Sequence, residues 1–204
     1  MKNNKKAFSI IEVMIAIFVF AFGLTSVFAM LSWSINMSDY SRNLIIASHL
    51  ADEQIELYKN IRDSNYKKSQ QWNIQNPADW FWSDVFVEGT YYKLTYNNAS
   101  AANFPIKVEE LVNFQWPVAN AQPTQSELIY MNDNYKLCIT PKWRYTYDCT
   151  TSANQDTIYY RYIKVKTPEF ITSNAVEVTS MVIWRGKKFH STEISTIVTD
   201  WKRY

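Results

Sequence analysis

The chain has 204 residues, of which 47% are hydrophobic and 16% aromatic, and its formal net charge is +2. With only 3 glycines and 2 histidines, it has little from which to build a phosphate-binding glycine loop or a two-histidine zinc helix. A near-neutral charge balance also argues against a dedicated nucleic-acid binder. We therefore expect no enzyme activity, no cofactor and no metal site.

Residues 8–33 form an apolar run that follows a basic stretch containing Lys2, Lys5 and Lys6. As one helix this run would be about 39 Å long, which is enough to cross the hydrocarbon core of a membrane. It is too long for an ordinary secretory signal and lacks the small-residue cleavage site of one. Because lysines favour the cytoplasmic side, we predict a single-pass cytoplasmic-membrane protein with an extracytoplasmic carboxyl-terminal domain.

Glu12 is the one charged residue in this run. A charge at the centre of a membrane helix costs about 3 kcal/mol on insertion scales, so such a residue usually has a function. The surrounding residues 6–16, KAFSIIEVMIA, resemble the prepilin cleavage and methylation signature of type IV pilins and pseudopilins. The resemblance implies that a prepilin peptidase cuts between Ala7 and Phe8 and methylates the new amine of Phe8. The family more often has glycine at the position of Ala7.

The resemblance also suggests what Glu12 does. Its carboxylate can pair with the Phe8 ammonium of a neighbouring subunit as that subunit leaves the membrane. Such a buried pair need not add stability, because desolvation opposes it. It can still fix the axial register, as polar groups do inside coiled coils. A plain signal anchor with an accidental glutamate is the alternative.

Residues 34–62 continue the helix as an amphipathic half, because no proline precedes Pro77 and no glycine lies between Gly23 and Gly89. Apolar residues recur there at spacings of three and four, which is the helical period. They are Tyr40, Leu44, Ala47, Ala51, Ile55, Tyr58 and Ile61. One helix from about Phe8 to Arg62 would be roughly 80 Å long. We interpret His49 as a solvated or packed helical residue, and the acidic residues 52–56 as a solvent face or a subunit contact.

The letters HLADEQIELYKNIRDSN also resemble the corresponding helix of minor pilins of the pilus-modification type. The family resemblance implies an α+β, type IV pilin-like fold, in which a long amino-terminal helix packs on an antiparallel β-sheet. On this basis residues 1–7 are a leader peptide and residues 63–204 are a β-rich globular domain.

Period-two patterns and turn residues predict the strands of that domain. We expect strands at residues 91–96, 135–140, 157–166, 176–184 and 189–198. In the last strand, His190 and Val198 should share a face from which Ser191 points away. Residues 66–89 are interpreted as a loop that covers one edge of the sheet, residues 97–126 as irregular, and residues 132–134 as a polar turn.

Cys138 and Cys149 both lie outside the membrane on this topology, in a compartment that permits oxidation. A disulfide between them would contribute about 3 kcal/mol by chain entropy. Two free thiols in the core are the alternative.

Arg185, Lys187 and Lys188 form a basic hairpin turn beside Trp184. Cations beside aromatic rings can contact single-stranded DNA or another ligand, but we favour the simpler interpretation of a solvated turn. The surrounding residues 178–201 resemble the terminal hairpin of prepilin-type minor pilins.

The combined features predict a minor subunit of a type IV pilus or a related filament. Its partners would be other pilin subunits, the prepilin peptidase and, before assembly, the inner membrane, and it would later lie at the cell surface. The alternatives are a pseudopilin of a type II secretion system, an adhesin or DNA-uptake pilin that binds nucleic acid, and an anchored receptor that is never processed.

Overall fold

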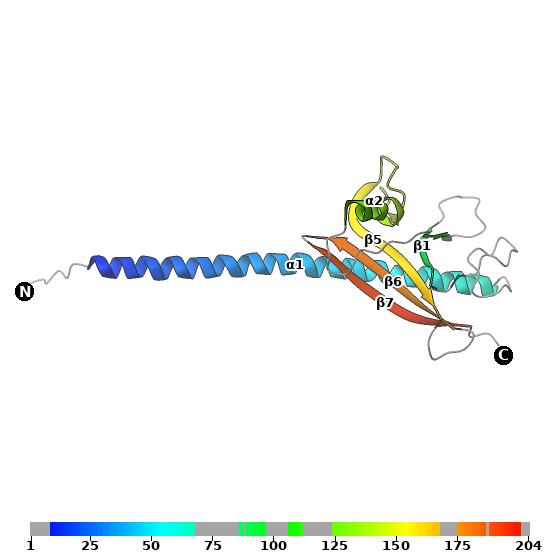
Figure 1. Cartoon of the computed structure of the whole chain (residues 1–204), viewed down its shortest axis with the longest axis horizontal. Helices are drawn as coiled ribbons and strands as arrows, with labels where there is room; N and C mark the ends of the chain where they lie inside the picture. The colour runs from blue at the N-terminus through cyan, green and yellow to red at the C-terminus, as the bar shows by residue number, and fades with distance from the viewer. Residues whose placement is uncertain are drawn as a thin grey trace, which may run out of the picture. The chain divides into compact units, whose positions relative to one another are not determined.

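Helix α1, Ile10–Lys67, is the longest element of the computed structural model, which describes residues 9–67, 86–87, 89–96, 106–111, 124–167, 175–186 and 188–200 (Figure 1). Phe8, the predicted first helical residue, lies outside this part of the chain. The helix continues five residues past the predicted end at Arg62, because its last turn makes contacts of its own. Asn65 is buried there, and the Tyr66 hydroxyl donates to Asp200 at 2.6 Å.

The chain divides into two units, residues 1–43 and residues 44–204. The second unit holds a seven-stranded sheet in which all neighbouring strands are antiparallel. The strands are β1 (Tyr91–Tyr96), β2 (Ile106–Glu110), β3 (Lys136–Ile139), β4 (Tyr145–Thr146), β5 (Gln155–Lys166), β6 (Ala175–Arg185) and β7 (Phe189–Thr199). The predicted class, a long helix followed by an antiparallel sheet, is therefore confirmed.

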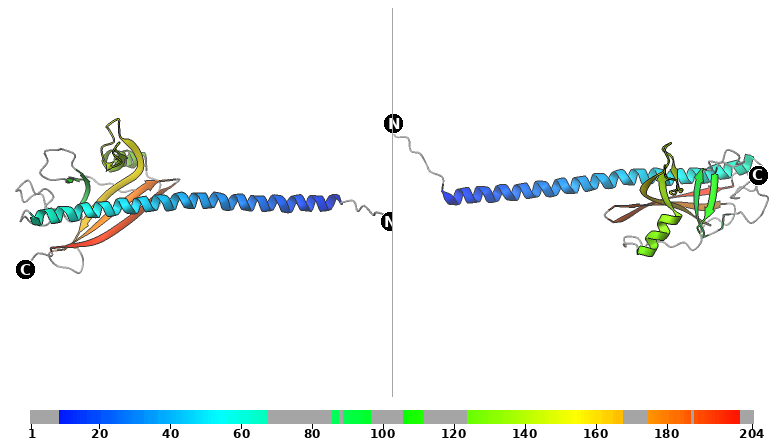
Figure 2. Two further views of the ribbon diagram at one scale, coloured as in Figure 1. Left: turned by 180° about the vertical axis from the view of Figure 1, so that it is seen from behind. Right: turned by 90° about the horizontal axis from the view of Figure 1, so that it is seen from above.

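Strand β5 is the centre of the sheet. It pairs with β3 through its first half, with β1 near its end, and with β6 over residues 159–166. Strand β6 then pairs with β7 along its whole length, and β1 pairs with β2 (Figure 2). The side chains of β5 therefore point alternately to the two faces of the sheet, near its centre.

One face of the sheet packs on the carboxyl-terminal half of α1. The predicted stripe is buried from Ala47 to Ile61. The core under the helix joins Leu57, Tyr58 and Ile61 to Ile163, Val165, Val178 and Val198, among others. Each fully buried aliphatic side chain of this kind stabilises the fold by about 1.5–3 kcal/mol.

The opposite face carries a second helix, α2 (Gln125–Asn134). Its Met131 packs with Tyr135, Tyr160, Tyr162 and Ile183. The rings of Tyr135 and Tyr162 meet edge to face, with centroids 6.0 Å apart, as aromatic quadrupoles prefer.

Three sequence interpretations were wrong in this region. Strand β2 and the start of α2 lie within residues 97–126, which had been interpreted as irregular, and residues 132–134 are the last residues of α2 and no separate turn. The short strand β4 had not been predicted either. Residues 66–89 lie largely outside the described part of the chain. In contrast, β7 alternates as predicted, since Val198 is buried and Ser191 is exposed.

Candidate functional site: the amino-terminal helix and its attachment

The first part of α1 presents apolar side chains on every side. All residues from Ile10 to Asp39 are exposed, and the ring of Phe22 keeps 72% of its surface accessible. An 18-residue window has a mean hydropathy of 2.4 and no buried residue. A helix that is apolar all round suits a lipid environment, and among the described residues α1 is the one helix long and apolar enough to cross a membrane.

Polar side chains in this segment bond to the helix itself. The hydroxyl of Thr25 donates to the Ala21 carbonyl at 2.6 Å, and that of Ser26 donates to the Gly23 carbonyl at 2.8 Å. In the hydrocarbon core there is no water, so polar groups must form their hydrogen bonds within the protein. These two hydroxyls therefore add little to the cost of burying the helix in a membrane.

Glu12 lies in the first turn of α1, where its backbone N–H donates to the Ser9 carbonyl at 3.0 Å. The carboxylate is exposed, and it has no ion-pair partner within the described residues. It flanks a shallow groove on one side of the helix that Ala16 and Phe20 also line. The favourable field of a helix amino terminus lowers the cost of this charge, but the carboxylate is left open to a cation from another chain.

The family described as the prokaryotic N-terminal methylation motif matches residues 2–28. This motif supports a type IV pilin-like protein. The match covers the basic stretch, Glu12 and most of the apolar run. It ends before the residues that resemble the pilus-modification type, so that subtype is not confirmed. No match to the chain was found among curated proteins or among solved structures.

The motif implies processing by a prepilin peptidase and assembly with other pilins. It also fits a protein anchored in a membrane by its amino-terminal helix, with a soluble carboxyl-terminal domain. Proteins with this motif are structural rather than enzymatic. Ala7 and Phe8, at the predicted cleavage and methylation site, lie outside the described residues.

A buried polar cluster attaches the second half of α1 to the sheet. Arg161 of β5 is only 2% exposed, and its Nη1 donates to the Leu50 carbonyl at 3.0 Å and to the Glu53 carboxylate at 2.7 Å. Its Nε donates to the Tyr147 hydroxyl at 3.3 Å. Burial opposes the charge of Arg161, but Tyr147 and Glu53 outweigh it, so the pKa of Arg161 is raised.

Two further polar residues complete this cluster. Gln54 donates to the Tyr147 hydroxyl at 3.2 Å and accepts from the Ser180 hydroxyl at 3.0 Å. The Tyr147 hydroxyl donates in turn to the Arg161 carbonyl at 3.0 Å. Burial raises the pKa of Tyr147, which keeps it a neutral donor.

Sequence reasoning had missed this cluster. Glu53 had been interpreted as part of a solvent face or a subunit contact, but it turns to Arg161. His49 is exposed, in line with a solvated residue. An arginine inside the apolar-rich strand IYYRYIKV was the one available signal, since a buried cation needs a partner.

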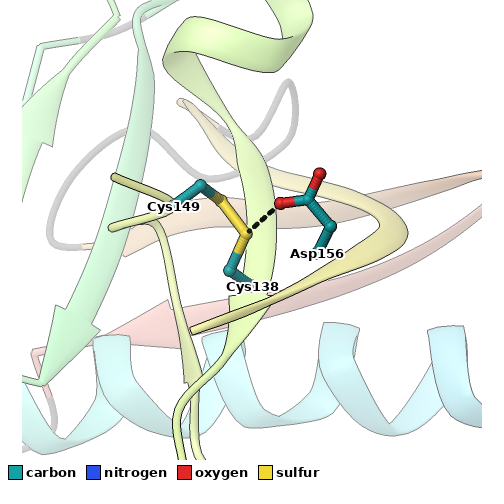
Figure 3. Close-up of side chains that lie close together, drawn as sticks. All are labelled: Cys138, Cys149 and Asp156. Carbon is teal, nitrogen blue, oxygen red and sulfur yellow. Dashed lines mark hydrogen bonds between the residues drawn. A yellow bond between two sulfur atoms is a disulfide. The ribbon is translucent and has the colours of Figure 1, made fainter. Parts of the chain in front are cut away.

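Cys138 and Cys149 are joined in a disulfide, in agreement with the sequence prediction. Figure 3 shows the Asp156 carboxylate beside this bond, with Oδ1 3.3 Å from the Cys138 sulfur. The other oxygen of Asp156 accepts from Lys136 at 2.6 Å. These groups are close enough to hold a metal ion. However, cysteine binds a metal ion as a thiolate, and neither sulfur is a thiolate while the disulfide is intact.

The turn between β6 and β7 holds Arg185 and Lys188, whereas Lys187 lies outside the described residues. Trp184 beside them is only 1% exposed, and its ring stacks on His190 with centroids 5.4 Å apart. A ring buried in this way is not free to stack on a nucleic-acid base. Trp184 therefore cannot supply the aromatic stacking that the predicted nucleic-acid contact needs.

Proposed function

We propose that this chain is a minor subunit of a type IV pilus, of the pilus-modification type. It is cut between Ala7 and Phe8, methylated at Phe8, and assembled through α1. The observation that carries the proposal is the placement of Glu12, a carboxylate at the start of a helix whose residues up to Ser38 are exposed and otherwise uncharged. The proposed role is structural rather than enzymatic, and the proposed final location is the cell surface.

In this proposal each part of the chain has its own task. Residues 1–7 are the leader, and residues 8–33 cross the membrane before assembly and line the filament core afterwards. Residues 34–62 continue the helix, and residues 63–204 form the outer domain. The apolar surface of the first half of α1 supports this division, since a helix without a sequestered face requires either lipid or other helices around it.

Assembly in this proposal depends on a charge pair between subunits. The new ammonium of Phe8 on one subunit meets the Glu12 carboxylate of its neighbour. An unpaired carboxylate in lipid is costly, so the pair forms as soon as a subunit with a free amine arrives. The pair sets how far each subunit rises along the filament.

The test compares the amount of Glu12→Ala and Glu12→Gln protein in sheared filaments with that of the unchanged chain. We expect both variants to insert in the membrane but to be lost from filaments. Glu56→Ala is the matched control, because Glu56 is an exposed glutamate on the same helix. Normal incorporation of Glu12→Ala would refute the charge-pair mechanism.

A pseudopilin of a type II secretion system is the second candidate, because the methylation motif fits pilin and pseudopilin substrates alike. Deleting the chain and measuring surface pili and secreted enzymes separately distinguishes the two filaments. Mass spectrometry of the mature amino terminus tests processing itself, since methylated Phe8 excludes an anchored receptor that is never cut.

A further inference from the structure

The turn at residues 140–144, between β3 and β4, presents a tryptophan to solvent. Trp143 is 83% exposed, the highest exposure of a large apolar residue in the described part of residues 44–204. Its neighbours Pro141, Lys142 and Arg144 are exposed too. An isolated apolar residue on a surface needs no explanation, but a fully presented indole between two cations has the composition of a recognition site.

The conformation of Trp143 is unusual as well. Its φ is +57°, and it is the one non-glycine residue with a positive φ in the described part of the chain. Bulky side chains rarely adopt this conformation, and where they do, the surrounding structure holds them there. Here the Trp143 N–H donates to the Thr140 carbonyl, and the Thr140 N–H donates to the Arg144 carbonyl, each at 2.9 Å.

A groove of about 140 Å³ lies against the indole. Its walls are Ile139, Thr140, Pro141, Trp143, Ala153 and Gln155. A cavity of about 150 Å³ accommodates one benzene ring, so this groove has room for one six-membered ring. Its polar groups are a hydroxyl and an amide, which suit the hydroxyl groups of a ligand.

The two cations next to Trp143 in sequence, Lys142 and Arg144, favour an anion. Within the described residues neither Lys142 nor Arg144 has an ion-pair partner. Among the carboxylates that follow in sequence, Asp156 pairs with Lys136 and Asp148 accepts from Thr150 and Thr151, and neither pairs with Lys142 or Arg144. The hydroxyl of Thr151, followed by that of Thr150, holds the pKa of Asp148 to about 2. The two cations therefore remain free for a ligand.

We propose that residues 140–144 and the adjoining groove bind a sugar ring that carries a carboxylate. The C–H face of the ring lies on the indole, whose negative π-face attracts positive edges. The carboxylate meets Arg144, which can grip it with two parallel hydrogen bonds, and Lys142 adds a second positive charge. The hydroxyl groups of the sugar exchange hydrogen bonds with Thr140 and Gln155.

Two other occupants fit less well. A nucleic-acid strand would need further cations to follow its phosphates, whereas the chain as a whole is close to neutral. A protein partner would need a larger complementary surface than a groove for one ring. The proposal is independent of the pilus assignment, because Trp143 lies outside the helix that carries the methylation motif.

The test is calorimetric titration of the full chain, in detergent micelles, with short oligomers of galacturonic acid and with the matching neutral oligomers of galactose. We expect the acidic oligomer to bind at least tenfold more tightly. Trp143→Gly should weaken that binding at least tenfold. Glycine tolerates the positive φ, so this variant keeps the turn. Arg144→Gln together with Lys142→Gln should remove the preference for the acid.

Controls keep the outcome interpretable. Tyr96→Ala removes another exposed aromatic ring, and Lys166→Gln another exposed cation, and neither should change the affinity. The disulfide and the unfolding temperature of each variant are measured alongside. The proposal is overturned if the acidic oligomer shows no saturable binding or if Trp143→Gly binds it unchanged. Tighter, Trp143-dependent binding of oligothymidylate would overturn it in favour of nucleic acid.

Discussion

Arg161 and Glu53 are 108 positions apart in the chain, and their side chains meet at 2.7 Å beneath α1. The guanidinium is almost fully buried, while the carboxylate keeps 32% of its side-chain surface exposed. The contact therefore joins the helix to the central strand of the sheet. Water reaches it only from the side of Glu53.

The first prediction concerns this pair. Glu53→Gln leaves a buried cation with weaker acceptors, so we expect the free energy of unfolding to fall. Breaking a fully buried pair costs about 3–5 kcal/mol, and the partial exposure of Glu53 reduces this to about 1–2 kcal/mol. Urea unfolding followed by near-ultraviolet circular dichroism measures the change.

The matched control is Glu56→Gln, because Glu56 pairs with Lys59 on the surface, where such pairs contribute little. Adding Arg161→Met to Glu53→Gln should recover part of the loss, since an apolar side chain of similar length needs no partner. If the double variant were less stable than Glu53→Gln alone, desolvation of Arg161 would not be the cause.

The second prediction concerns alkaline pH. Burial raises the pKa values of Tyr58, Tyr135 and Tyr162 above the ordinary tyrosine value of about 10. Above that pH the unfolded chain releases these protons while the folded chain keeps them, so stability is full below about pH 10 and falls as pH rises further. Thermal unfolding between pH 8 and pH 12 should show this loss.

The Phe variants of these tyrosines identify the groups responsible. Tyr135→Phe should lower stability slightly at neutral pH and flatten the alkaline decline, because one of the retained protons is gone. The exposed Tyr96 supplies the control, as Tyr96→Phe should leave the slope unchanged. An unaltered slope in Tyr135→Phe would exclude Tyr135 as a source and leave Tyr58 and Tyr162 to be tested by the same substitution.

The third prediction concerns the disulfide. Reduction of Cys138–Cys149, or its replacement by two alanines, should lower the free energy of unfolding by about 2–3 kcal/mol. Comparing unfolding midpoints with and without reductant measures this. The double-alanine variant should not respond to reductant, and any response would show that the reductant acts elsewhere.

The fourth prediction concerns the start of α2. The Thr124 hydroxyl accepts from the Glu127 N–H, and the Glu127 carboxylate accepts from the Thr124 N–H at 2.6 Å, which forms a capping box. Thr124→Ala should cost about 1 kcal/mol. Gln125→Ala, at an exposed position in the same turn, is the comparison, and equal losses in both variants would argue against the cap. Urea midpoints give both values.

Patterns of local periodicity were sufficient for the long helix and for the strands β1, β3, β5, β6 and β7. The spacing of Ala47, Ile55 and Ile61 identified the buried stripe, and the alternation from His190 to Val198 identified the inner face of β7. The prepilin-type motif around Glu12 was equally local, so it needed no tertiary information.

Elements that depend on distant partners were not predicted. Strand β2 is held by its pairing with β1. Its alternation of Ile106 and Val108 with Lys107 and Glu109 is only five residues long and directly follows Pro105, so it gave a weak strand signal. Helix α2 left a readable signal in Thr124 and Glu127, but the nearby prolines favoured an irregular interpretation. The Arg161–Glu53 contact could not be predicted because its partners are far apart in sequence.

The anchoring of α1 through Leu50 and Glu53 has a practical result. Both groups lie beyond Asn43, where the two units divide. A shortened chain that starts at Leu44 would lack the exposed apolar part of α1. It would keep every hydrogen bond between Arg161 and the helix. We expect residues 44–204 to be purified without detergent and crystallised on their own.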